Sequence, residues 1–326
     1  MDFDLFDIEL FINIAEATSL TGGAVRSHIS IPAASTRIKN IEDKLGTKLL
    51  YRTRSGITLS PSGQAFLLRG RLVLQQLQYL LGDLQNHAPG AKGHVRISGA
   101  TVALTDYLPA PLRTYLTAHP EVMIDLRERN ARDTVCEVRD GSADIGFICS
   151  FGYPIPTEGL EAVPYRRDPL VLVTAVNHSL AARKTISFIE TLDFNYVSLF
   201  ATSTTHATLE RAACAAHKPL KVRLNVSNFE AVCRMIEPNI GIGVVPESIA
   251  IRNARARAIR IIPFSDDWAK TRNVQILVRS RKSLPSFVRE LIASVIYDSE
   301  CDAVQVPIDT KASGSQSKKL TPGPAF

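Results

Sequence analysis

The chain has 326 residues, 45% of them hydrophobic, and a formal net charge of +6. This length predicts two or three domains, and the absence of any apolar run near the roughly eighteen residues that span a bilayer argues against a membrane partner. The acidic start of the chain argues against a secretion signal, and five scattered cysteines without a CxxC pair fit reduced thiols, so we expect a cytoplasmic protein.

A first helix is expected over residues 4–17. Its apolar residues recur at helical spacing: Ile8, Phe11, Ile12 and Ala15. Thr21 is the expected cap of a second helix, although Gly22 and Gly23 follow it, each unfavourable by about 1 kcal/mol relative to alanine. Either a close approach of the backbone to a phosphate or tolerated drift of the sequence explains the two glycines, and we favour sequence drift.

A third helix is expected to begin at Ser30 and Pro32 and to end at Gly46. One stripe of it is apolar: Ala34, Ile38, Ile41 and Leu45. The opposite face is polar and basic, with Pro32, Thr36, Lys39 and Asn40 flanked by Ser35. Two short helices in this order predict a helix-turn-helix whose second helix fits a DNA major groove. An ordinary helical hairpin with a solvated outer face is the alternative.

Local charge favours the DNA interpretation. Residues 18–71 contain nine Lys and Arg but only two acidic residues, Glu42 and Asp43. Residues 49–52 and 57–59 predict a β-hairpin wing with Arg52 and Arg54 at its tip. These two arginines either contact DNA or are solvated charges.

A long helix is expected from Ser60 and Pro61 to about Asn86. Its apolar seam alternates spacings of four and three residues and is widened by three further leucines: Phe66, Gly70, Val73, Leu77, Leu80 and Leu84, with Leu67, Leu74 and Leu81. So wide a face predicts a partner helix and therefore a dimer or tetramer. Packing against the chain's own C-terminal part is the alternative, which we disfavour because residues 87–93 have the composition of a hinge.

From residue 94 short apolar strands alternate with helices, which predicts an α/β region. Strands are expected at 95–98, 122–126, 144–149, 170–174, 196–199, 222–226, 241–245 and 274–279, and helices at 107–116 and 285–296. Gly241 and Gly243 are half of a dinucleotide fingerprint and are interpreted as a turn into a buried strand. The Pro-, Ser- and Lys-rich residues 299–326 are expected to be disordered.

Residues 11–63, with FINIAEATSLT, SIPAAS, IKNIEDKLGTKLLYRT and LSPSG, resemble the N-terminal domain of LysR-type bacterial transcriptional regulators. Weaker matches continue in order with AHPEV, DGSADIGF and GIGVVP, as far as about residue 298. The resemblance implies a winged helix-turn-helix (1–60), a linker and dimerisation helix (61–87), a hinge (88–93) and a two-lobed effector domain (94–298) of the periplasmic-binding-protein-like type 2 fold. Lobe I would comprise 94–164 and 271–298, and lobe II 165–270. Some members of this family sense peroxide through cysteines, a role we give little weight here.

Candidate DNA contacts follow from the predicted helix and wing: Ser30, Ile31, Pro32, Ser35, Thr36, Arg37, Lys39, Arg52 and Arg54. The family commonly has Gln at the position of Ile31 and Arg at that of Thr36, side chains that pair with adenine or guanine edges. We therefore hypothesise that this chain reads thymine methyl groups through Ile31 and Thr36.

Candidate effector contacts lie at the carboxyl ends of strands and at helix N-termini, where open α/β folds bind anions. They are Ser98, Ala100, Thr101, Asn130, Thr202, Ser203, Thr204 and Asn228. Each serine, threonine and asparagine among them could equally be an ordinary helix cap. The candidate dimerisation residues are Phe66, Val73, Leu77, Leu80 and Leu84.

The sequence contains no GxSxG, Walker A or HExxH motif, and its histidines show no metal-ligand spacing, so we expect no enzyme activity, cofactor or metal. The expected function is transcriptional regulation through double-stranded DNA, a small-molecule effector such as an organic anion, and self-association. The alternative is a small-molecule-binding or catalytic protein whose basic N-terminal hairpin mediates protein contacts.

Overall fold

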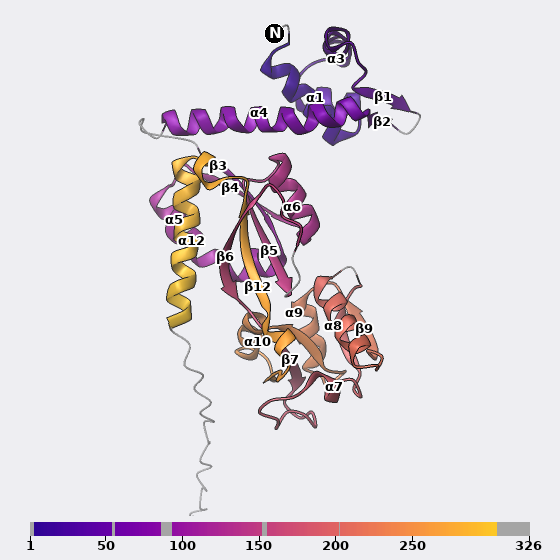
Figure 1. Ribbon diagram of the computed structural model, residues 1–326, viewed down its shortest axis with the longest axis vertical. Coiled ribbons are helices and arrows are strands. Elements are labelled where there is room, and N and C mark those ends of the chain that lie inside the picture. Colours follow the sequence, from indigo (N-terminus) through magenta and orange to yellow (C-terminus); the bar gives the residue numbers. More distant parts are fainter. Residues whose placement is uncertain (1–2, 54–55, 86–92, 152–154, 202, 305–326) are drawn as a thin grey trace, which may run out of the picture.

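Figure 1 shows the computed structural model of the chain, which describes residues 3–53, 56–85, 93–151, 155–201 and 203–304. A small helical unit and one long helix lie across one end of an α/β region with two lobes. Within the described residues, no helix combines the length and apolarity needed to cross a bilayer.

The N-terminal unit has three helices and a two-stranded hairpin: α1 (Leu5–Ala17), α2 (Leu20–Arg26), α3 (Ile31–Leu45), β1 (Leu50–Thr53) and β2 (Gly56–Leu59). The predicted helix-turn-helix and wing are thus present. Ala34, Ile38 and Ile41 of the predicted apolar stripe are buried, whereas Leu45 is 41% exposed. The buried part of the stripe thus ends at Ile41, and Gly46, in the left-handed region at φ 64°, ends α3 where the sequence predicted.

Two expectations about α2 are wrong. Its cap is Ser19, whose hydroxyl accepts a hydrogen bond from the Gly22 amide, and not Thr21. Gly23 is not drift: a Cβ there would lie 2.2 Å from Ile14 Cγ1 and 2.6 Å from Ile14 Cα. The glycine therefore permits α2 to pack directly on the backbone of α1, and the close approach is to a helix and not to a phosphate.

The long helix α4 (Pro61–Gln85) begins as predicted after Ser60, whose hydroxyl accepts from the Gly63 amide at 2.9 Å. Its first turns pack on α1, and its later turns lie along the end of the α/β region (Figure 1). Of the hinge predicted at residues 88–93, residues 88–92 lie outside the described residues and only Gly93 is described.

Lobe I is built on a five-stranded sheet in the order β4-β3-β5-β12-β6. The strands are β3 (His94–Gly99), β4 (Met123–Glu128), β5 (Ile145–Phe151), β6 (Glu161–Arg167) and β12 (Arg272–Val278). β3 runs parallel to β4 and β5, and β12 returns antiparallel between β5 and β6. A late segment of the chain thus completes the first sheet.

Helices cover both faces of this sheet. α5 (Pro109–Ala118) and α12 (Ser286–Val304) pack together on one face, and α6 (Ala131–Asp140) covers the other. Strand alternation explains the division, since Phe147 and Ile276 belong to the large core and Ile148 and Leu277 to the cluster under α6. Short turns lie at η1 (Ala103–Tyr107) and η2 (Arg281–Ser283).

Lobe II has a three-stranded antiparallel sheet, β10-β7-β11, and a parallel pair, β8-β9. Its strands are β7 (Leu170–Ala175), β8 (Tyr196–Leu199), β9 (Val222–Val226), β10 (Gly243–Pro246) and β11 (Ile259–Pro263). Its helices are α7 (Phe188–Thr191), α8 (Thr204–Ala215), α9 (Phe229–Ile236), α10 (Glu247–Ala254) and α11 (Asp267–Lys270).

The predicted strands are all present with shifts of a few residues, but two helix boundaries differ. The helix expected at 107–116 is α5, displaced because Pro109 opens it after the π-helical turn η1. The last helix continues through residues 299–304, which were expected to be disordered. Ser299 is buried there and donates to the Ile296 carbonyl. Residues 305–326 lie outside the described residues.

Candidate functional site

The outward face of α3 is exposed as the sequence predicted. Pro32, Thr36, Lys39 and Asn40 are exposed, Ser35 is half-buried, and Ile31 at the helix start is 44% exposed. Ser30 caps the helix through a hydrogen bond from the Ala33 amide. The side chains opposite the core are therefore largely exposed along the first two turns of α3.

Two side chains of this helix make contacts within the chain. The Thr36 hydroxyl donates to the Pro32 carbonyl at 3.0 Å, so its methyl group is the part left to face a partner. Arg37 was a candidate DNA contact, but its guanidinium lies 2.6 Å from the Asp7 carboxylate and over the ring of Phe6. Arg37 thus joins α3 to α1 and faces away from the outward side.

The wing is tied to α3 by Glu42. Its buried carboxylate accepts hydrogen bonds from the Lys48 ammonium at 2.6 Å and from the amides of Leu49 and Leu50. Burial would raise the pKa of Glu42, but these hydrogen bonds outweigh it and hold the pKa below its ordinary value. In the wing, Arg52 belongs to β1 with its side chain not described, and Arg54 lies outside the described residues.

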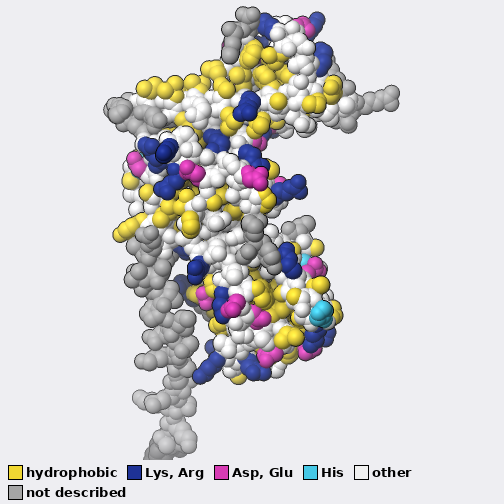
Figure 2. Space-filling model, viewed as in Figure 1, with side chains coloured by type: hydrophobic (Ala, Val, Ile, Leu, Met, Phe, Trp, Pro, Cys, Tyr) yellow, Lys and Arg dark blue, Asp and Glu magenta, His cyan; other side chains and the backbone are white. Residues whose placement is uncertain are grey.

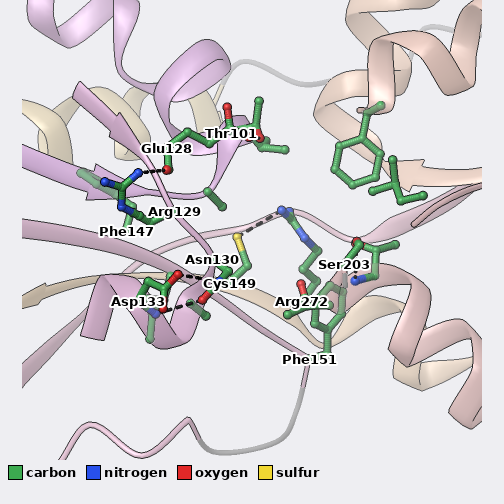
Figure 3. A pocket seen from close by; sticks show the side chains of 18 of the residues that line it. Thr101, Glu128, Arg129, Asn130, Asp133, Phe147, Cys149, Phe151, Ser203 and Arg272 are labelled. Carbon is green, nitrogen blue, oxygen red and sulfur yellow. Dashed lines mark hydrogen bonds between the residues drawn. The ribbon is translucent and has the colours of Figure 1, made fainter. Parts of the chain in front are cut away.

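A cavity of about 530 Å³ opens between the two lobes (Figure 3). Lobe I contributes the segment after β3, the segment between β4 and α6, and the end of β5. Lobe II contributes the end of β8, the start of α8 and the segment between β9 and α9. In Figure 3 Thr101, Glu128, Asn130 and Asp133 stand on one side of it, and Ser203 and Arg272 on the other.

Five of the eight predicted effector contacts line this cavity: Ala100, Thr101, Asn130, Ser203 and Thr204. Asn130 and Ser203 are also helix caps, so capping a helix and lining the cavity do not exclude each other at these residues. Thr202 lies outside the described residues.

Two predicted contacts do not line the cavity. Ser98 is fully buried because β3 continues through Gly99, one residue beyond its predicted end. Asn228 caps α9 by accepting from the Ala231 amide at 2.8 Å, while its neighbours Ser227 and Phe229 reach the cavity instead.

Sequence reasoning missed Arg272, a buried arginine in the cavity wall at the start of β12. Its guanidinium pairs with Asp168 at 2.6 Å and donates to Cys149 Sγ at 3.2 Å, while its Nε has no partner among the described residues. Tyr107 and Ser248 also hydrogen-bond to Asp168, so elements of both lobes meet at one carboxylate. In the sequence, the only hint of this cluster is an arginine shortly before the apolar residues of this strand.

The cysteines of the described part show no paired site. Cys149 and Cys233 are buried, which raises the pKa of both thiols, and Cys136 and Cys214 are exposed and free. Among the described residues, no three His, Cys, Asp or Glu side chains are grouped to hold a metal ion.

The apolar seam of α4 divides between two environments. Phe66, a candidate dimerisation residue, packs its ring on Phe11 and Phe3 and so belongs to the N-terminal core. Val73, Leu80 and Leu84 are 46%, 55% and 62% exposed, and Leu77 is half-buried. Figure 2 shows hydrophobic side chains along the edge of α4 that faces away from the lobes.

A different face of α4 does contact the chain's own C-terminal region, the alternative that the sequence analysis disfavoured. Gln75 and Tyr79 are buried there against Asp144. One face of α4 therefore packs on lobe I, while another face exposes apolar side chains.

A helix-turn-helix unit joined through a long helix to a two-lobed domain with a central cavity defines a ligand-responsive regulator. Two family models match this chain: "Bacterial regulatory helix-turn-helix protein, lysR family" over residues 5–64 and "LysR substrate binding domain" over residues 88–297. Because the second covers more than half of the chain, the protein belongs to the LysR family. The predicted fold and the predicted transcriptional regulator with an effector-binding domain are confirmed.

Similar proteins match this chain over most of its length. A probable RuBisCO transcriptional regulator of Synechocystis sp. is 24% identical over 304 residues, covering 89% of this chain and 86% of that protein. A full-length OxyR variant from Pseudomonas aeruginosa has a TM-score of 0.72 at 20% identity, covering 92% of this chain and 95% of that one. Full-length CbnR complexed with its target DNA has a TM-score of 0.60 at 22% identity, covering 91% and 100%. These two structures are likenesses of fold.

Proposed function

We propose that the outward face of α3 enters the DNA major groove and reads base edges through Ile31, Ser35, Thr36 and Lys39, with Pro32 beside them. The observation that carries this proposal is the hydrogen bond from the Thr36 hydroxyl to the Pro32 carbonyl, which leaves a methyl group on the exposed face of the helix. A methyl group packs against the thymine methyl and makes no hydrogen bond to a guanine edge.

A gel shift on selected operator DNA at several salt concentrations tests this proposal. Specific binding should weaken steeply as salt rises, and Lys39→Gln should reduce the logarithmic salt slope by about one if Lys39 meets a phosphate, or change base preference if it meets a base. If the variant keeps both the salt slope and the base preference of the wild type, Lys39 does not contact the DNA. We propose that the effector domain binds its ligand without transforming it. Turnover of a small molecule by a chain that does not bind DNA would instead favour a catalytic protein.

We further propose that the cavity binds a small organic anion with its anionic group against lobe II. The N-terminus of α8 lies there with Ser203, Thr204 and Thr205, and Arg272 is adjacent. A helix N-terminus presents free N–H groups and a positive dipole end. The carboxylates of Glu128 and Asp133 stand on the lobe I wall and exclude an anion from that side.

A thermal-shift screen of small carboxylates and sulfonates tests the effector proposal, because a ligand that binds only the folded chain raises its melting temperature. Neutral amides of the same acids are the matched controls. Shifts by the acids alone would support the proposal, whereas equal shifts by acids and amides would contradict an anion site at α8.

We propose self-association through α4. Its exposed residues Val73, Leu80 and Leu84 continue into an apolar groove of about 700 Å³ that is lined chiefly by Phe3, Leu5, Phe6 and Ile8. An exposed apolar surface of this kind marks an interaction site, and α4 of a second copy presents the same apolar residues. Sedimentation of the full chain as a dimer or tetramer is expected, and a monomer at micromolar concentration would refute it.

The division of the chain is also proposed: 1–60 as the DNA-binding domain, 61–87 as the dimerisation helix, 88–93 as the hinge and 94–298 as the effector domain, acting in the cytoplasm. The sheets support the lobe boundaries because β3 to β5 and β12 share one sheet, while β7 to β11 belong to the other lobe. β6 begins in the predicted lobe I segment and ends at Arg167, three residues past its boundary.

A further inference from the structure

A buried carboxylate joins α4 to lobe I. Asp144, directly before β5, accepts hydrogen bonds from the Tyr79 hydroxyl at 2.8 Å and from Gln75 Nε2 on α4. It also accepts from the Arg96 backbone amide at 2.7 Å and pairs with the Arg96 guanidinium. Asp144, Gln75 and Tyr79 are all at most 5% exposed, so this contact is buried and hydrogen-bonded, unlike an incidental surface contact.

A second contact connects three parts of the chain. Arg71 on α4 pairs with Asp140 at the end of α6 at 2.8 Å and with Glu16 on α1 at 3.0 Å. Glu16 also pairs with Arg26 on α2 at 3.5 Å. We call Arg71, Gln75, Tyr79, Asp140 and Asp144 the α4 latch.

One buried group of the latch and one buried group beside it lack hydrogen-bond partners among the described residues. Gln75 Oε1 and Arg279 Nη1 are both buried without a hydrogen-bond partner among the described residues. Both approach Gly141, where a Cβ would lie 2.9 Å from the first and 2.7 Å from the second. A buried acceptor and a buried donor left unpaired carry a desolvation cost. A small movement of α4 against β12 that pairs them would give the latch a second arrangement.

The lobe I elements that carry the residues facing α4 each reach the effector cavity at their other end. β5 leads from Asp144 to Cys149 and Phe151, and α6 leads from the cavity segment 130–133 to Asp140. β3 carries Arg96 near one end and is followed by Ala100 in the cavity wall. β12 starts at Arg272 in the wall and is followed by Arg279 at the latch.

We propose that the α4 latch reports the state of the effector cavity to the DNA-binding unit. Paired strands and a packed helix move as rigid bodies, so a displacement of their cavity ends shifts Asp140 and Asp144 under α4. Arg71 then passes the change to α1 through Glu16. This inference rests on the proposed effector cavity. Energetic coupling between two sites is reciprocal, so a change at the latch must also affect the cavity segments, and this effect can be measured in the chain without a ligand.

Native-state hydrogen exchange of the full-length chain, without any ligand, tests the latch. The variant Gln75→Leu with Tyr79→Phe removes the hydrogen bonds to Asp144 and keeps apolar bulk, and Gln76→Leu, an exposed neighbour on α4, is the control. Releasing the latch should accelerate exchange at the cavity segments 100–102 and 130–133 by about threefold to thirtyfold, the range of typical coupling energies. The control should leave these segments unchanged.

Acceleration confined to α4 and residues 140–146 would overturn the proposal, because the latch would then be a local contact. If the double variant loses its helical circular dichroism signal, Tyr79→Phe alone is measured against the same expectation. Failure of the effector proposal is separable: coupling without any thermal shift by organic acids refutes the cavity's ligand and leaves the latch. Thermal shifts without coupling refute the latch.

Discussion

Gly23→Ala distinguishes the sequence-based account of α2 from the structural one by the sign of its effect. If the glycine were drift, alanine would stabilise the helix by about 1 kcal/mol. In the structure the new Cβ would lie 2.2 Å from Ile14 Cγ1 and 2.6 Å from Ile14 Cα. A rotamer change moves only the first atom, so α1 and α2 must separate. Overpacking of this kind reaches about 3 kcal/mol, and after the propensity gain we expect a net destabilisation of about 2 kcal/mol.

Hydrogen exchange of the full-length chain measures this effect within the N-terminal unit, since a multidomain protein need not unfold in one step. Amides of Phe11 and Ile12 should exchange about thirtyfold faster in Gly23→Ala. Thr21→Ala is the control, because Thr21 is exposed and does not cap α2; it should stabilise by about 0.5 kcal/mol. Slower exchange in Gly23→Ala than in the wild type would refute the close-packing explanation.

Three further predictions follow from buried or exposed groups. The pKa of Glu42 is lowered in the folded state, so its carboxylate should stabilise the fold fully above its unfolded pKa and progressively less as the pH falls through its folded pKa. Glu42→Gln should lower the free energy of unfolding by about 1–3 kcal/mol at neutral pH and flatten this acid dependence. Melting curves of the variant that keep the wild-type pH dependence would count against the prediction. Leu80→Glu with Leu84→Glu should yield monomers in sedimentation while Gln76→Glu does not, and an intact oligomer would exclude the α4 interface. Arg272→Met removes the ion-pair partner of the buried Asp168 carboxylate and should destabilise the effector domain by about 3–5 kcal/mol, against which a melting temperature equal to wild type would argue.

The fold was predictable where local rules and tertiary packing agree. Ser30, Pro32 and Gly46 bound α3 in the sequence as they do in the structure, and Ser60 and Pro61 begin α4. Local rules failed where packing decides. Nothing near Gly23 in sequence shows that Ile14 touches it, so the glycine was open to misinterpretation.

The candidate site was predictable only in part, for a similar reason. Strand ends and helix starts are visible in sequence, and they led to Thr101, Asn130 and Ser203 in the cavity wall. Arg272 was missed because it lies more than a hundred residues from Asp168 and is placed by the return of β12 into the first sheet. The partners of Arg37 were missed because a helix pattern gives the face of a residue but not the length over which its side chain reaches.

The central claim is that the outward face of α3 contacts base edges. Binding-site selection with the full-length chain and with Thr36→Arg tests it most directly, since arginine pairs with guanine and the threonine methyl with thymine. We predict that the variant gains guanine at one position of each half-site where the wild type prefers thymine. An identical preferred sequence for both proteins would contradict the account.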